Sequence, residues 1–285
     1  MKKIFSFIGA ATIISLSIII SEKTTAVVKN IDNLMTEIQQ QEQEYMTPPI
    51  NATIKDNTIT PGINGKKIDI QQTYNEMKKI GEFNKKYIKY EQTQPEITIE
   101  NNYDKYIVSG NKQKNSVSIV FLLYNDENIE KIKQILKKNN TQATFFIDSV
   151  WLEKNNNQLK ELTNLGHTIG NLTPNIDYQD MEFIMINNII KQETTQTHYY
   201  CYSKTQNEQT LNKCRQYRHY TIIPNIIIKT NPLKEIKKQI TPGAIIELPI
   251  NDKTYNELEL IIKYINSKGY TIKNLEEHLS EKNNN

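Results

Sequence analysis

The sequence predicts an α/β fold organised as a closed or nearly closed barrel of parallel strands. From about Asn115 onward, short apolar segments alternate with amphipathic segments that have the length of ordinary helices. Strands that alternate with helices in this way pair in parallel through right-handed crossovers. About seven such units follow one another, and this number favours a barrel over an open sheet.

The first strand and helix of the series show the pattern clearly. The segment "SVSIVFLLY", residues 116–124, is almost continuously apolar, which is typical of a strand buried on both faces. The next segment, residues 125–140, has one apolar helical face, formed by Ile129, Ile132, Ile135 and Leu136. Asn125 and Asp126 stand where an N-cap is expected.

The remaining segments continue the alternation to the C-terminus. We expect strands in residues 141–148, 167–171, 198–202, 220–224, 226–230 and 243–250. We expect helices in residues 151–166, 181–193, 208–218, 233–240 and 255–269. Gly166 follows the helical pattern where a left-handed C-terminal residue belongs.

The part of the chain before residue 115 divides into three predicted regions. Residues 1–25 form a signal peptide or signal anchor, and residues 26–49 form a polar, helical stalk that ends at Pro48 and Pro49. Residues 50–114 form a mixed extension, with a helix over 73–87 and strands at 96–100 and 106–110. The main domain is predicted over residues 115–280, followed by a tail at 281–285.

The N-terminal apolar run, Ile4–Ile20, follows Lys2 and Lys3. Its length is short for a membrane span and long for the core of a cleaved signal, so both interpretations stay open. In either case we expect an extracytoplasmic protein, anchored to the membrane through residues 4–20 or secreted after cleavage. Cys201 and Cys214 fit no metal-binding spacing, and the sequence leaves open whether they form a disulfide or two buried thiols.

The charge distribution argues against nucleic-acid binding. The formal net charge is only +3, and lysine and glutamate are interleaved along the chain. A nucleic-acid-binding surface requires a concentrated basic face. We therefore expect no nucleic-acid partner.

The blocks "ATFF" and "GHTIGN", residues 143–146 and 166–171, carry a family resemblance. Together with "PGAIIELPIN" near the C-terminus, they resemble the polysaccharide deacetylase (NodB-homology) family, over roughly residues 61–279. The resemblance implies an irregular (β/α) barrel. It also implies a divalent metal such as zinc, held by one aspartate and two histidines, with an aspartate base and a histidine acid that hydrolyse an N-acetyl group.

The sequence departs from that family at each of these positions. The paired aspartates fall on Leu122 and Leu123, the second of which is the metal position. The two metal histidines fall on Leu172 and Ile176, and the acid histidine falls on Pro249. The arginine of the family's third motif falls on Tyr200. We therefore expect no catalytic residues, no metal ligands and no cofactor in this chain.

The four histidines are widely separated in the sequence and form no pair with metal-ligand spacing. We expect structural roles for His167 and His219 at strand starts, and an exposed position for His278. Asp126 and Asp148 have the spacing of helix caps.

These observations predict a non-catalytic cell-envelope protein that binds a cell-wall glycan or an envelope protein. The candidate ligand-binding residues are Asn171, Thr173, Asn175, Tyr200 and Tyr202. Tyrosine rings can stack on sugar faces, and amide or hydroxyl groups can bind sugar hydroxyls.

Two alternatives remain. One is an active carbohydrate deacetylase or hydrolase that uses displaced residues such as Asp126, His198 and Glu247. The other is a scaffold whose extension, residues 50–111, contacts an envelope complex.

Overall fold

The computed structural model describes residues 32–124, 129–172 and 180–283. These residues form two compact units. The smaller unit comprises residues 32–49 and 64–94, and the larger unit comprises residues 50–63 and 95–283. The predicted extension, residues 50–114, is thus divided between the two units, because residues 50–63 and 95–114 pack with the main domain.

The smaller unit contains helices and one hairpin-like sheet. Its elements are α2 (Asn33–Tyr45), β3 (Gly65–Ile68), α3 (Ile70–Met77), the 3-10 helix η1 (Lys85–Tyr87) and β4 (Tyr90–Thr93). Strands β3 and β4 pair antiparallel. The core forms where Met35 and Ile38 of α2 meet Tyr74 and Met77 of α3. The Tyr74 hydroxyl donates a 2.7 Å hydrogen bond to Asp32, whose carboxylate also caps α2.

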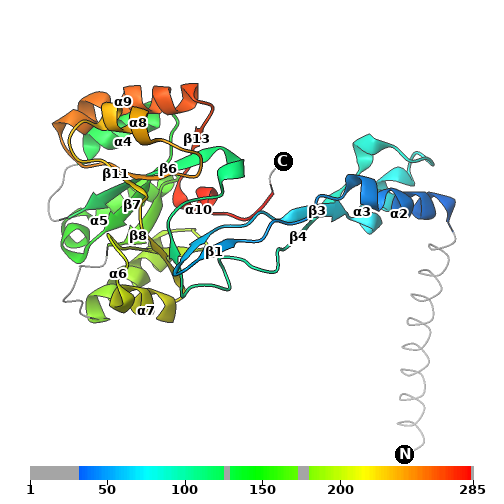
Figure 1. Cartoon of the computed structure of the whole chain (residues 1–285), viewed down its shortest axis with the longest axis horizontal. Helices are drawn as coiled ribbons and strands as arrows, with labels where there is room; N and C mark the ends of the chain where they lie inside the picture. The colour runs from blue at the N-terminus through cyan, green and yellow to red at the C-terminus, as the bar shows by residue number, and fades with distance from the viewer. Residues whose placement is uncertain (1–31, 125–128, 173–179, 284–285) are drawn as a thin grey trace, which may run out of the picture. The chain divides into compact units, whose positions relative to one another are not determined.

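The larger unit is built on a curled, mainly parallel sheet (Figure 1). Its strands are β1 (Thr53–Lys55), β2 (Thr58–Thr60), β5 (Tyr106–Ile107), β6 (Ser116–Leu123), β7 (Thr144–Ile147), β8 (Thr168–Asn171), β9 (Tyr199–Tyr202), β10 (His219–Ile222), β11 (Ile226–Ile227), β12 (Ile245–Glu247) and β13 (Thr271–Ile272). The order is β1-β2-β5-β10-β9-β8-β7-β6-β12-β11, with β13 also paired to β6. All of these pairs except β1–β2 are parallel.

The sheet has the curvature of a half-barrel. Its edges in the described residues are β1 and β11, which do not pair with each other. The prediction of parallel α/β architecture is confirmed, and the sheet is open at this seam. The strand β11 is only two residues long, which leaves few backbone groups for closure.

Helices cover the outside of the half-barrel (Figure 1). They are α4 (Glu130–Lys138), α5 (Ser149–Asn164), α6 (Asp180–Glu193), α7 (Glu208–Gln216), α8 (Pro232–Gln239) and α9 (Asp252–Ser267). A short 3-10 helix, η2 (Lys112–Lys114), precedes β6, and α10 (Leu275–His278) ends the fold. The predicted cap by Asp148 is confirmed, because its carboxylate accepts a 2.7 Å hydrogen bond from the Trp151 backbone N–H. Gly166 has the predicted left-handed conformation, with φ of 79°.

Two apolar cores lie on the two faces of the curled sheet. The outer core contains Phe121, Leu123 and Phe145, packed against Trp151 and other helical residues. The inner core contains Val120, Phe146, Leu172 and Tyr202, together with Leu275 of α10. Alternate residues of β6 therefore belong to alternate cores, as the pleat of a strand requires.

Two predicted elements of the extension differ in the structure. Residues 96–100, predicted as a strand, form bends and a turn. The helix predicted over 73–87 ends at Met77, since Gly81 adopts φ of 80° and a separate 3-10 helix begins at Lys85. Within the described residues, no helix is long and apolar enough to span a membrane. The predicted anchor, residues 4–20, lies outside them.

Candidate functional site

The carboxyl ends of β6, β8 and β12 meet at one end of the half-barrel, because these strands run parallel. We call this end the mouth. Leu122 ends the inner face of β6, and Leu172 directly follows β8. Leu172 is only 2% exposed and both leucines pack in the inner core. Aliphatic side chains therefore fill positions where the sequence comparison placed an acid and a metal ligand.

Leu123 has a different environment from its neighbour. Its side chain is fully buried in the outer core with Phe121 and Ile147, on the helix side of the sheet. The side chain of Leu123, the predicted metal position in β6, therefore points away from the mouth. The reason is the two-residue repeat of a strand, which directs Leu122 inward and Leu123 outward.

Among the described residues, a tyrosine and a glutamate form a polar pair at the mouth. The Tyr202 hydroxyl at the end of β9 donates a 2.7 Å hydrogen bond to Glu247 Oε2 at the end of β12. Burial raises the pKa of Glu247 above its usual value, although the bond from Tyr202 opposes this shift. Burial and the neighbouring carboxylate also raise the pKa of Tyr202. Tyr202 is only 3% exposed and Glu247 is half-buried, so the Glu247 carboxylate is the more accessible member of the pair.

Pro249 lies two residues after Glu247 and is partly exposed. A proline side chain cannot transfer a proton, so this position supplies no general acid. The more accessible residues near the pair are Tyr124, which is 40% exposed, and Lys204, whose charge acts on Glu247.

The prediction for Asn171 as a ligand-binding residue is wrong. Its side chain is fully buried and donates to the Asn187 side chain at 3.0 Å, between β8 and α6. The strand alternation directs it toward the helices, whereas Leu172 packs inward. The other candidates in this loop, Thr173, Asn175 and Ile176, lie outside the described residues.

Tyr200 also differs from its prediction as a ligand-binding residue. It shares the inward face of β9 with Tyr202, but its hydroxyl donates a 3.0 Å hydrogen bond to Glu276 of α10. Tyr200 is only 2% exposed, and burial raises its pKa well above the usual value. It belongs to the closed, amino-terminal end of the half-barrel.

The same end contains His198. Its Nδ1 lies 2.9 Å from Glu276 Oε1, and this hydrogen bond raises the pKa of His198 against the opposing effect of burial. Burial favours protonation of Glu276, but hydrogen bonds from His198, Thr197 and Tyr200 lower its pKa to about 2. His198 and Glu276 therefore form a hydrogen-bonded pair that attaches α10 to β9 and becomes an ion pair when His198 is protonated.

The catalytic set proposed as the first alternative is not assembled. His198 precedes the amino end of β9, whereas Glu247 ends β12. These strands belong to a parallel series, so the two side chains lie at opposite ends of the sheet. Asp126, the third member, lies outside the described residues.

The structural roles predicted for His167 and His219 are confirmed. His167 Nδ1 accepts a 3.1 Å hydrogen bond from the Ala143 backbone N–H, and His219 Nδ1 donates to the Tyr217 carbonyl at 2.9 Å. Burial lowers the pKa of each to about 4.

The expected exposed position of His278 is wrong, because its side chain is 1% exposed. Its Nε2 donates to the Gly243 carbonyl at 3.2 Å, and its Nδ1 lies 2.9 Å from the Ser116 hydroxyl. Burial lowers its pKa to about 4. The polar sequence around His278 does not indicate that this side chain is buried, because its burial depends on where α10 packs.

The residues at the family's metal positions do not fit a metal ion. The side chains of Leu123, Leu172 and Ile176 have no donor atom, and zinc requires nitrogen, sulfur or oxygen ligands. Across the described residues, no group of three or more histidine, cysteine, aspartate or glutamate side chains is arranged to hold a metal.

Cys201 and Cys214 form a disulfide, with Cα atoms 6.2 Å apart. The bond joins β9 to α7 behind the mouth, and both sulfur atoms are buried with Phe183. Of the two interpretations that the sequence left open, the structure has the disulfide.

A family model described as polysaccharide deacetylase matches residues 109–222. This match begins before β6 and ends with β10, so it covers the central strands of the half-barrel. This central part of the chain resembles a polysaccharide deacetylase domain. The matched residues include the motifs "ATFF" and "GHTIGN", which contribute to β7 and β8.

Similar proteins occur in Bacillus. The uncharacterized protein YlxY of Bacillus subtilis is 28% identical over 283 residues, which cover 90% of this chain and 87% of that protein. The crystal structure of BA3943 from Bacillus anthracis, described as a CE4 family pseudoenzyme, has 26% identity and a TM-score of 0.67. That match covers 88% of this chain and 96% of BA3943.

Bacillus subtilis PdaA, described as a family 4 carbohydrate esterase, has a TM-score of 0.54 at 20% identity. The match covers 81% of this chain and 96% of PdaA. At this identity the likeness concerns the fold of the polysaccharide deacetylase domain.

Proposed function

We propose that this protein is a non-catalytic polysaccharide-deacetylase-like protein of the cell envelope, whose mouth binds a glycan. The observation that carries the proposal is the packing of Leu122 and Leu172 in the inner core at the positions of an acid and a metal ligand. A metal-dependent deacetylase needs a bound cation, a base and an acid around one carbonyl group. Aliphatic side chains supply none of these.

Loss of the metal removes a reason to keep charged groups at the mouth. Unpaired carboxylates that face a buried cavity without a cation are costly to desolvate. Leucine at the same positions gains free energy from burial of its apolar surface. These substitutions would stabilise the deacetylase-like fold while removing the groups that the deacetylation reaction needs.

The similarity to BA3943 supports this interpretation. That protein is described as a pseudoenzyme, and a mutant of it is described as having restored enzymatic activity. In that relative, then, substituted residues account for the missing activity while the fold is retained. We extend the same reasoning to this chain because the match covers most of both proteins.

The extracytoplasmic location rests on two observations. Lys2 and Lys3 precede an apolar run, Ile4–Ile20, that has the character of a signal or anchor. The Cys201–Cys214 disulfide is typical of proteins in oxidising compartments.

The glycan site that we propose uses the polar pair at the mouth. Tyr202 and Glu247 are already oriented toward each other, so little side-chain entropy is lost when a sugar hydroxyl binds Glu247. The nearby Tyr124, 40% exposed, offers a ring on which a sugar face can stack.

The test compares two tyrosines on the same face of β9. Binding of a chitooligosaccharide to the full-length protein is measured by isothermal titration calorimetry for the wild type, Tyr202→Phe and Tyr200→Phe. Each substitution removes one hydroxyl that is bonded to a glutamate, so the stability cost is similar, about 1 kcal/mol. We expect Tyr202→Phe to weaken binding about tenfold and Tyr200→Phe to leave it unchanged, since only Tyr202 lies at the mouth.

Equal effects of the two substitutions, or binding of neither a chitooligosaccharide nor a peptidoglycan fragment by the wild type, would refute the glycan site. Binding of peptidoglycan fragments but not chitooligosaccharide would keep the site and change the glycan. Release of acetate from the oligosaccharide would refute the non-catalytic assignment.

A further inference from the structure

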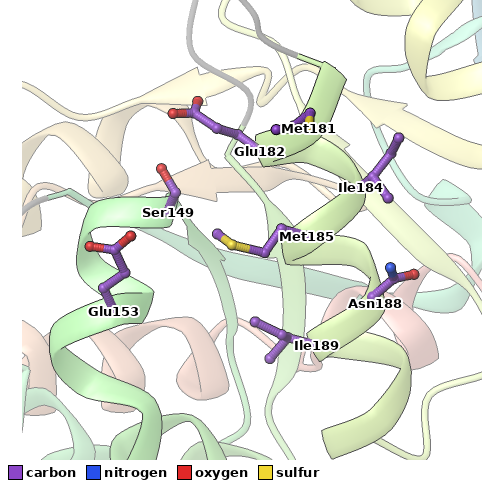
Figure 2. Close-up of a pocket in the computed structure, with 8 residues that line it drawn as sticks. All are labelled: Ser149, Glu153, Met181, Glu182, Ile184, Met185, Asn188 and Ile189. Atoms are coloured by element: carbon purple, nitrogen blue, oxygen red, sulfur yellow. The ribbon is translucent and has the colours of Figure 1, made fainter.

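An open apolar groove lies outside the half-barrel, between helices α5 and α6. Its volume is about 630 Å³, and Figure 2 shows Ser149 and Glu153 on α5 facing residues of α6 that include Glu182 and Met185. The groove is lined by residues of the outer helices, and none of them belongs to the inner core or to the Tyr202–Glu247 pair.

Helix α6 has more apolar surface than one packed face requires. Its inner residues, Phe183, Ile186 and Ile190, are buried against the sheet and the disulfide. Its outer residues Met181, Ile184 and Met185 are also apolar but are 78%, 37% and 36% exposed. A surface helix normally presents polar residues to water, and a cluster of exposed apolar residues marks an interaction site.

The charges at the groove have a single sign. Glu153 and Glu182 line it from opposite helices, and its lining contains no lysine or arginine. Neither carboxylate forms an ion pair or hydrogen bond with another residue in the described part of the chain. Methionine side chains are flexible and adapt to the shape of an apolar partner. The groove therefore combines an adaptable apolar floor with two uncompensated negative charges.

We propose that this groove binds a segment of a partner protein that carries apolar residues next to lysine or arginine, such as one face of a basic amphipathic helix. The apolar side chains would cover the two methionines, and the cations would pair with Glu153 and Glu182. A second copy of the same groove is disfavoured, since an isologous contact would bring like charges together. An anionic lipid surface is disfavoured for the same electrostatic reason.

The experiment uses the full-length protein and a fluorescently labelled synthetic peptide with leucine on one helical face and lysine on the other. A matched peptide carries glutamate in place of lysine. Binding is followed by fluorescence anisotropy. The two groove variants are Met181→Ser with Met185→Ser, and Glu153→Gln with Glu182→Gln. The matched controls are Leu260→Ser, at a position 53% exposed on α9, and Glu208→Gln, exposed at the start of α7.

We expect the lysine peptide to bind the wild type, with about tenfold weaker binding to each groove variant and unchanged binding to both controls. The glutamate peptide should not bind. The substituted side chains are solvent-exposed or at the groove rim, so all variants should unfold at nearly the wild-type temperature.

Failure of the lysine peptide to bind, equal binding of the glutamate peptide, or equal loss in the control variants would overturn the proposal. So would concentration-dependent dimerisation, or binding to phosphatidylglycerol vesicles, that is lost in the methionine variant, because a second copy or a membrane would then cover the groove. Chitooligosaccharide binding is unaffected in the groove variants if both proposals hold, so the two sites fail or succeed separately.

Discussion

Leu122 and Leu123 are neighbours in β6 that face opposite cores. Leu123 is fully buried among outer-core residues, whereas Leu122 is partly exposed near the mouth. An aspartate at position 123 would place an unpaired carboxylate among apolar side chains, but one at 122 could reach water. We expect Leu123→Asp to lower the free energy of unfolding by about 4 kcal/mol and Leu122→Asp by less than about half of that.

Urea denaturation of the two variants measures the difference. Leu123→Met, which keeps the volume and polarity of the site, should cost less than about 1.5 kcal/mol and serves as the control. If Leu122→Asp were the more damaging substitution, the strand would have the opposite orientation to the one described.

Glu247 is a carboxyl group that folding places in a less polar environment. Because its pKa is raised in the folded protein, the folded state binds more protons than the unfolded state between the unfolded and folded pKa values. Stability from this group therefore falls as pH rises through that interval. We expect Glu247→Gln to increase the melting temperature relative to wild type at pH 7 more than at pH 4, as measured by calorimetry. A larger gain at pH 4 would contradict the assigned burial.

At the scale of elements, the Cys201–Cys214 disulfide fixes α7 to β9 across a sequence separation of 13 residues. In the chain-entropy description, closing a loop of this size stabilises the folded state by about 3 kcal/mol. We expect the double variant Cys201→Ser with Cys214→Ser to lose about this much in urea denaturation. Reduction of the wild type with dithiothreitol should produce a similar loss, and no loss in either experiment would mean that the bond is not formed.

Helix α10 is held at the amino-terminal end of the half-barrel by the buried His278, which contacts Ser116 and the Gly243 carbonyl. His278 has a pKa of about 4 in the folded protein because it is buried, whereas the unfolded chain binds a proton near pH 6.5. The free energy of unfolding therefore has its full value with respect to His278 above about pH 6.5. It decreases as pH falls toward 4, because the unfolded chain then binds a proton that the folded protein does not. The positive charges of Lys114 and Lys273 oppose protonation of His278 further.

We expect His278→Gln to make the free energy of unfolding less dependent on pH between 6.5 and 4.5, measured by urea denaturation at several pH values. His198→Gln should not have this effect, since the pKa of His198 is raised and its ion pair with Glu276 is retained in this interval. An unchanged pH slope in His278→Gln would show that the histidine is accessible to solvent.

For the molecule as a whole, the sequence was sufficient for the parallel α/β architecture and for most helices and strands after residue 115. The strong alternation of apolar strands and amphipathic helices carries this information locally. The division of residues 50–114 between two units was not predictable, because it depends on contacts such as the pairing of β2 with β5 and of β5 with β10. The open seam between β1 and β11 is likewise a property of the whole sheet.

The candidate site was predictable only in part. The apolar substitutions at Leu122 and Leu172 can be read from the motif, and both residues lie in the inner core. The motif does not indicate where the side chains of Asn171 and Tyr200 point. Asn171 is directed to the helices by the pleat, and Tyr200 points to the closed end, where Glu276 arrives from 76 residues away in the sequence.

The account depends most on the absence of a metal at the mouth. Titration of the full-length, metal-stripped protein with zinc in a calorimeter, followed by an acetate-release assay on an N-acetylated chitooligosaccharide, tests this directly. We expect no stoichiometric zinc binding and no acetate above the background of a heat-denatured sample. One tightly bound zinc ion per chain together with acetate release would contradict the account.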